Sequence, residues 1–169
     1  MSEDFIKKIY LHGEGIKSIK NIDITNVVSI DQLLEKFEKE SDTNFDNSDK
    51  GIEIFLDSVG KKSASEELLE KISDKDHIHC HRCKKVKSII VYNGDRYEIE
   101  SPPNEKLHVI LQKALTHFNI SKNDGADMVL RYHDAKGNIL QDNDRIGSFT
   151  DYPKCEATLS LTSKRNVQG

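Results

Sequence analysis

The segment SIIVYNGDRYEIE, residues 88–100, decides the fold of the second half of the chain. At its centre lies Asn93-Gly94, the dipeptide that most strongly favours a two-residue hairpin turn. The runs on either side, Ser88–Tyr92 and Arg96–Glu100, are therefore predicted to pair as antiparallel strands. Pro102-Pro103 then ends the pairing, because proline has no N–H to donate to a neighbouring strand.

A helix is expected next, with Asn104 as its N-cap. The apolar residues that follow recur at helical spacing and form one stripe, namely Leu107, Ile110, Leu111, Ala114, Leu115 and Phe118. Further strands are predicted over Met128–Tyr132 and Ala157–Leu161, separated by a turn at Gly137 and a short turn over Ile146–Phe149.

The first half of the chain repeats this order of elements with little residue identity. Its helix is predicted to begin after Ser29, with Gln32 completing a capping box. The apolar face of that helix comprises Ile30, Leu33, Leu34 and Phe37. The other expected elements are strands at Lys8–Leu11, Ile19–Thr25, Ile52–Leu56 and Ile78–His81, a turn at Gly13-Glu14-Gly15 and a short helix at Glu66–Ile72.

A hairpin, one covering helix and a last strand that returns beside the first is an α+β plan. Equivalent elements recur about 75 to 80 residues apart, which suits tandem domains better than a solenoid with its shorter period. We therefore predict two tandem β-grasp (ubiquitin-like) domains, over 5–83 and 85–162, and a flexible C-terminal tail over 163–169. The junction Cys83-Lys84-Lys85 contains no flexible linker composition, so free tumbling of the domains is not expected.

Composition excludes several classes of protein. The 169 residues carry a net charge of −4, which argues against nucleic-acid binding. No apolar run approaches the roughly 20 residues that a membrane span needs, and the acidic start Met1–Asp4 does not resemble a secretory signal. The three cysteines do not make a disulfide scaffold, so we expect a reducing cytoplasm.

The cluster HIHCHRC, residues 77–83, is the one candidate for a metal site. Two histidines that are two apart on a strand could share a metal ion, and Cys80 and Cys83 have C-x-x-C spacing. Cys155 could join them if the first and last strands of the second domain are neighbours. The candidate ligands are therefore His79, Cys80, His81, Cys83 and Cys155. The favoured interpretation is that no metal binds, that Cys80 and Cys155 are small apolar side chains in strands, and that the histidines face solvent.

Enzymatic motifs are missing from the sequence. It contains no G-x-S-x-G elbow, phosphate-binding glycine loop or H-E-x-x-H motif, so we expect no catalytic residues and no cofactor. Clustered charges, including Asp57, Lys61 and Lys62, are interpreted as ordinary surface charge.

The second half resembles a known family in Arg82–Val86, in Asp144–Phe149, in Cys155 and in the closing Arg165–Gly169. These residues are similar to those of bacterial ubiquitin-like modifiers encoded beside their own activating, conjugating and deconjugating enzymes. The two-domain layout resembles the vertebrate interferon-stimulated modifier and its bacterial antiphage counterpart, the Bil systems.

That resemblance implies a modifier without catalytic residues of its own. A cognate activating enzyme would adenylate the Gly169 carboxylate with ATP, and a conjugating enzyme would deliver it to target proteins such as phage virion components. A deconjugating peptidase would reverse the step. The residues expected to be recognised in the tail are Lys164, Arg165, Asn166, Val167 and Gln168. Two alternatives stay open, a non-covalent ubiquitin-like adaptor and a sulfur carrier that forms a thiocarboxylate.

Overall fold

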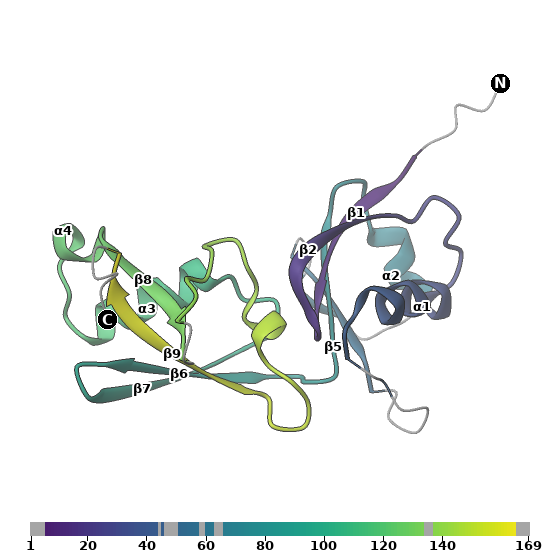
Figure 1. Ribbon diagram of the computed structural model, residues 1–169. Helices are drawn as coiled ribbons and strands as arrows, with labels where there is room; N and C mark the ends of the chain where they lie inside the picture. Colours follow the sequence, from purple (N-terminus) through teal and green to yellow (C-terminus); the bar gives the residue numbers. More distant parts are fainter. Residues whose placement is uncertain are drawn as a thin grey trace.

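The chain forms two bodies that lie side by side in the computed structural model (Figure 1). The structure describes residues 6–43, 45, 51–57, 60–62, 66–133 and 137–164. Each body contains one mixed sheet and its own apolar core.

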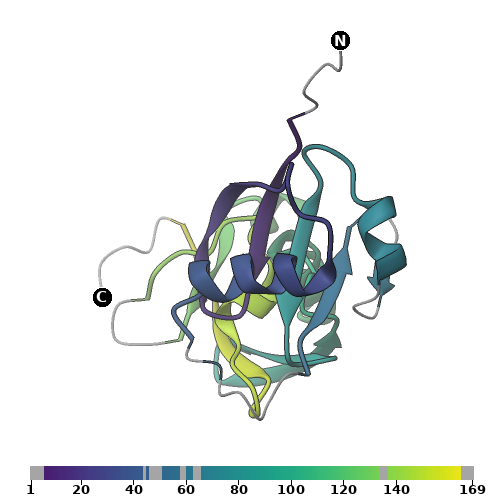
Figure 2. The same ribbon diagram turned by 90° about the vertical axis from the view of Figure 1, so that its right-hand side faces the viewer.

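The first body contains a five-stranded sheet in the order β2-β1-β5-β3-β4. Strands β1 and β5 lie parallel at its centre, and the other neighbours are antiparallel. The elements are β1 (Lys8–Gly13), β2 (Ile16–Asp23), α1 (Ile30–Glu40), β3 (Glu53–Leu56), β4 (Gly60–Lys62), α2 (Glu66–Lys71) and β5 (His77–His81). Figure 2 shows α1 lying across the face of this sheet that points away from the second body.

The second body contains a four-stranded sheet in the order β7-β6-β9-β8, in which β6 and β9 are the parallel pair. Its elements are β6 (Val86–Tyr92), β7 (Asp95–Ser101), α3 (Leu107–His117), α4 (Lys122–Gly125), β8 (Met128–Tyr132), the 3-10 helix η1 (Ile146–Phe149) and β9 (Glu156–Ser163). Both bodies have the strand order of a β-grasp fold, so the predicted α+β fold with two tandem β-grasp domains is confirmed.

The predicted helix faces are the ones that pack. Ile30, Leu33 and Phe37 are buried in the first core, and Leu34 packs against it. In the second domain the α3 stripe from Leu107 to Leu115 is buried. Both stripes follow from local periodicity alone, because a helix above a sheet has one direction in which to bury an apolar face.

The two helix starts have different causes. Ser29 caps α1 as predicted, and its hydroxyl accepts from the Gln32 N–H at 3.3 Å. The prediction for Asn104 is wrong, because α3 begins after Lys106 and has no side-chain cap. The first helical N–H groups donate instead to the backbone carbonyls of Asp144 and Asp142, so a loop satisfies the donors that a cap would otherwise take.

Strand β9 extends further than predicted. Thr162 and Ser163 still pair with Val129 and Met128 of β8, and the Lys164 N–H donates to the Asp127 carbonyl at 2.6 Å. Ser163, expected in the tail, therefore belongs to the sheet. Residues 165–169, with the predicted Gly169 site, lie outside the described residues.

Candidate functional site

The outer face of the first sheet, opposite α1, is the face that docks onto the second domain. Alternation along β5 places Ile78 and Cys80 in the core and His77, His79 and His81 on the outer face. His79 and His81 are nevertheless buried, as is Phe55 on neighbouring β3. The prediction that the histidines face solvent is therefore wrong, because the second domain covers this face.

Four histidines from two strands form a ladder on this face, namely His12, His77, His79 and His81. His12 lies opposite His79 in the parallel pairing of β1 with β5, and its Nε2 is 2.9 Å from Nδ1 of His77. The rings of His79 and His81 stack with centroids 5.8 Å apart. Within the described part of the chain, neither ring nitrogen of His79 has a hydrogen-bond partner.

Burial keeps these histidines neutral. It lowers the pKa of His12 to about 3, with a further contribution from the Arg145 guanidinium. Burial also lowers the pKa of His79 well below its ordinary value, and the neighbouring His81 and His12 act in the same direction. A proton on either ring would place a poorly solvated charge inside the interface, so the docked state favours neutral imidazoles.

Glu14 forms the centre of a second group of contacts between the domains. Its side chain is fully buried, and it accepts from Arg82 Nε at 2.9 Å and Nη2 at 2.7 Å. It also accepts from the Tyr152 backbone N–H at 2.9 Å. Burial alone would raise the pKa of Glu14, but these hydrogen bonds outweigh it and hold the pKa below its ordinary value.

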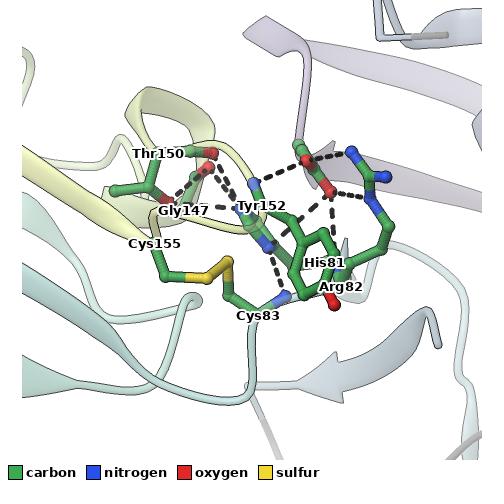
Figure 3. The surroundings of a disulfide bond; sticks show 8 residues. His81, Arg82, Cys83, Gly147, Thr150, Tyr152 and Cys155 are labelled. Carbon is green, nitrogen blue, oxygen red and sulfur yellow. Dashed lines mark hydrogen bonds and ion pairs between the residues drawn. A yellow bond between two sulfur atoms is a disulfide. The ribbon is translucent and has the colours of Figure 1, made fainter. Parts of the chain in front are cut away.

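The residues around Glu14 connect the linker, residues 82–85 between β5 and β6, to a loop of the second domain (Figure 3). His81 Nε2 donates to the carbonyls of Gly147 at 3.0 Å and Thr150 at 2.9 Å, while its Nδ1 accepts from the Cys83 N–H. The Arg82 guanidinium lies over the Tyr152 ring, 5.1 Å from its centroid. These contacts fix which His81 nitrogen carries the proton, because carbonyls only accept.

Asp57 makes a third contact between the domains. Its carboxylate pairs with Arg145 Nη2 and accepts from the Asn104 amide at 3.3 Å. Arg145 is one of the largest fully buried side chains of the described residues. The prediction that Asp57 is ordinary surface charge is therefore wrong, because its partners belong to the other domain, 88 positions away for Arg145.

Cys83 and Cys155 form a disulfide, with Cα atoms 5.9 Å apart. The interpretation of Cys155 as a free apolar residue in a strand is wrong, since Cys155 precedes β9 and bonds to the linker. Cys80 is free and buried, as predicted, and burial raises the pKa of its thiol to about 12.

The candidate metal ligands do not assemble into a metal site. Cys83 and Cys155 are joined to each other, and Cys80 points into the first core, away from His79 and His81. In the described ranges no three histidine, cysteine or acidic side chains are grouped so as to hold a metal ion.

Residues 88–164 match the family model described as BilA ubiquitin-like domain 2. The second domain is therefore similar to a BilA ubiquitin-like domain. The match includes η1, the loop that follows it and β9, so the residues of this segment that dock onto the first domain and the strand that leads to the tail lie within the matched region. Nothing in the curated set of proteins matches the chain.

The solved structures similar to this chain that follow each cover about half of it. The ubiquitin of Caldiarchaeum subterraneum is 23% identical, covering 50% of this chain and 99% of its own, with a TM-score of 0.37. A protein of Arabidopsis thaliana is 15% identical, covering 51% of this chain and 98% of its own, with a TM-score of 0.37. A design based on ubiquitin is 13% identical, covering 51% and 96%, with a TM-score of 0.38.

The second domain carries its last strand away from the domain junction. Strand β9 begins at Glu156, paired with Lys87 next to the linker, and ends at Ser163, paired with Met128. Figure 1 shows that this end lies near α4, on the side of the second domain remote from the first. The first domain therefore does not cover the end of the strand from which the tail continues.

Several residues of the interface were not predicted from the sequence. Glu14 stands between two glycines in a hairpin turn, and Arg145 and Gly147 lie in the segment that carries the family resemblance, but nothing local assigns them to a domain contact. One available signal was the alternation of His77, His79 and His81, which places all three on one face of a strand.

No helix in the described residues has the length and apolar character needed to cross a bilayer.

Proposed function

We propose that this chain is a ubiquitin-like protein modifier of a bacterial antiphage conjugation system, acting in the cytoplasm. A cognate activating enzyme adenylates the Gly169 carboxylate with ATP and takes it up as a thioester. A conjugating enzyme then transfers it to an amine of a target protein, with phage virion components as the proposed targets. A dedicated peptidase removes it.

The observation that carries the proposal is the match of residues 88–164 to BilA ubiquitin-like domain 2, a match that ends immediately before the closing Arg165–Gly169. The direction of β9 supports it, since the strand ends on the side remote from the first domain. An activating enzyme that holds the second domain can therefore reach the tail without displacing the first.

The chain itself supplies the surface that its partner enzymes recognise and the carboxylate that becomes the electrophile. ATP supplies the energy, and the covalent intermediates form on the partner enzymes. A resting carboxylate does not form an amide at a useful rate, so ATP must first convert it into an acyl adenylate. Glycine at the reacting end has no Cβ to crowd a narrow channel. We propose that Lys164, Arg165, Asn166, Val167 and Gln168 are the residues that the activating enzyme reads.

The experiment incubates the full chain with the activating enzyme encoded beside it and ATP. The expected product is an enzyme adduct that thiol treatment releases. Deleting Gly169 should abolish the adduct, whereas the control variant Val28→Ala, at an exposed position of the first domain, should still form it. An adduct that survives deletion of Gly169, or the lack of any adduct with the intact chain, would overturn the proposal.

Two further readouts identify the alternatives. A non-covalent adaptor would retain partner binding and its effect in cells after removal of residues 165–169. A sulfur carrier would accumulate a free form whose intact mass shows sulfur in place of one carboxylate oxygen.

A further inference from the structure

Three successive residues, His81 at the end of β5 and then Arg82 and Cys83 of the linker, each contact residues 147–155 of the second domain. His81 donates to the carbonyls of Gly147 and Thr150, Arg82 lies over the ring of Tyr152, and Cys83 is bonded to Cys155. Figure 3 shows these side chains gathered in one small region. The first two contacts are non-covalent, and the third is a disulfide.

We propose that the Cys83–Cys155 disulfide is a reversible redox switch, here called the clasp, that controls how tightly the two domains dock. When it is closed, the loop over residues 150–155 is held against the linker and the first domain. When it is opened by a dithiol reductant, this loop is released and the docking loosens.

The bond is placed to control the loop because it fixes the loop's last residue. The Cys155 N–H donates to the Asp151 carbonyl at 2.8 Å, and the Cys155 carbonyl accepts from the Lys87 N–H at 2.9 Å. Cys155 therefore anchors a turn whose Tyr152 N–H binds Glu14 of the first domain. Without the bond, the turn keeps only non-covalent contacts, namely its hydrogen bonds and the Arg82–Tyr152 contact, which are individually weak.

The two bonded cysteines differ in their exposure. Cys83 is buried, with 1% of its surface exposed, whereas Cys155 is partly exposed. Cys80, which completes the three cysteines, is buried in the first core, and its raised pKa keeps it a thiol at neutral pH. A thiol is a poor nucleophile for disulfide exchange, so the reductant must come from outside the chain.

The exchange balances as a two-electron reaction with an external dithiol. One thiolate of the dithiol attacks Sγ of Cys155, forming a mixed disulfide and expelling the Cys83 thiolate, which takes up a proton. The second thiolate of the dithiol then attacks the dithiol's first sulfur, the one bonded to Cys155 in the mixed disulfide, and expels the Cys155 thiolate, which is protonated in turn. The chain gains two electrons and two protons, and the dithiol becomes a disulfide; an oxidised dithiol closes the clasp by the reverse steps.

The redox role of the disulfide can be tested on the folded chain alone, so the result does not depend on whether the chain is conjugated through Gly169. It gives the disulfide a role in the proposed cytoplasmic setting, where persistent structural disulfides are uncommon and reversible ones serve as redox sensors.

The test compares the intact chain after oxidation with oxidised dithiothreitol and after reduction with dithiothreitol, using hydrogen exchange with mass spectrometry. Reduction should raise exchange in residues 150–155 and 81–83 by about ten-fold or more, since these amides then open locally. Exchange in α1 and β8, which lie in the two cores, should not change. Alkylation after denaturation should count one thiol in the oxidised chain and three in the reduced chain.

Cysteine variants supply the controls. Cys83→Ser with Cys155→Ser should show the fast exchange under both conditions, and Cys80→Ala, which keeps the bond, should respond like the wild type. Unchanged exchange on reduction of the wild type would overturn the clasp, as would three free thiols after oxidation. A rise of exchange throughout both cores would also overturn it, because the bond would then be a general stabiliser of the fold. The wild-type comparison needs no substitution, so poor folding of a variant does not remove the test.

Discussion

The Glu14 carboxylate accepts a hydrogen bond at 2.9 Å from the Tyr152 N–H, 138 positions further along the chain. Glu14 also receives two hydrogen bonds from the guanidinium of Arg82, the first residue of the linker. One buried acid thus connects the first hairpin, the linker and the last loop of the second domain. The buried Glu14 carboxylate holds the domains in one arrangement, because separating the domains would remove the hydrogen bond from the Tyr152 N–H.

Glu14→Gln should therefore weaken the docking of the domains. The variant is nearly isosteric but leaves the Arg82 guanidinium, which is only 10% exposed, without its counter-charge. Removing one partner of a buried pair costs about 3 kcal/mol. We expect a lower midpoint of thermal unfolding and faster exchange of the Tyr152 amide. Glu98→Gln is the matched control, because the pair of Glu98 with Lys87 is exposed and should contribute less than about 1 kcal/mol. Equal effects of the two substitutions would contradict the role assigned to Glu14.

Gly147→Ala should separate the two domains at the histidine ladder. A Cβ at this position would lie 2.2 Å from His79 Nε2 and 2.8 Å from Pro103 Cβ, distances that no packed side chain tolerates. Relief requires His79 to move, and overpacking of this kind costs about 1–3 kcal/mol. Small-angle scattering should show a more extended molecule.

The control for Gly147 is Gly51→Ala, where an added Cβ meets nothing within 4 Å. That variant should leave the scattering curve unchanged. A compact Gly147→Ala protein with unaltered exchange at His79 and His81 would mean that the interface accommodates the methyl group.

Docking should weaken as the pH falls. The pKa values of His12, His79 and His81 are lowered in the docked state, mainly by burial. Below about pH 6.5, the ordinary pKa of histidine, the separated state binds more protons than the docked state. For each histidine that takes up a proton on separation, the free energy of docking then weakens by about 1.4 kcal/mol per pH unit. This stabilisation is therefore present above pH 6.5 and is lost on acidification, down to about pH 3 for His12.

Other charged groups near the histidine ladder also affect this pH dependence. Arg145 adds a positive charge that opposes protonation, whereas Asp57 and Glu14 favour it. Glu14 itself has a lowered pKa, so its contribution is also lost as the pH falls. Hydrogen exchange of residues 81–83 between pH 8 and 5, corrected for intrinsic rates, should show the loss. His79→Phe should reduce the pH dependence, and His108→Gln, at an exposed position, should not. A flat profile in the wild type would contradict the account.

The sequence predicts what depends on neighbours in the chain. The helix stripes at Ile30–Phe37 and Leu107–Leu115 and the Asn93-Gly94 hairpin come from local periodicity and turn chemistry, and the structure contains them. The strand order follows because one helical crossover makes the first and last strands of each domain parallel.

The docking face could not be predicted in the same way. Alternation places His77, His79 and His81 on one side of β5, but an alternating polar face is equally compatible with solvent and with another domain. The contact of Asp57 with Arg145 joins residues 88 positions apart, and no local pattern encodes it. The disulfide was missed for a related reason, since the spacing of three cysteines does not determine which two bond.

Phe55 and Leu56, adjacent on β3, allow docking and folding to be separated. Both are fully buried, but Leu56 belongs to the first core, whereas Phe55 lies on the outer face with its ring edge-on to His79. Phe55→Ala should cost about 3–5 kcal/mol of docking while the first domain stays folded. Leu56→Ala should instead destabilise that domain by about 2–5 kcal/mol.

Hydrogen exchange of the full chain distinguishes the two outcomes. In Phe55→Ala, exchange should rise at residues 81–83 and 150–155 and stay slow in α1, because the α1 face of the sheet is intact. In Leu56→Ala, exchange in α1 should rise, because Leu56 and the helix share one core. If Phe55→Ala also released α1, Phe55 would stabilise the first domain itself, and the outer face of its sheet would not act as a separate docking surface.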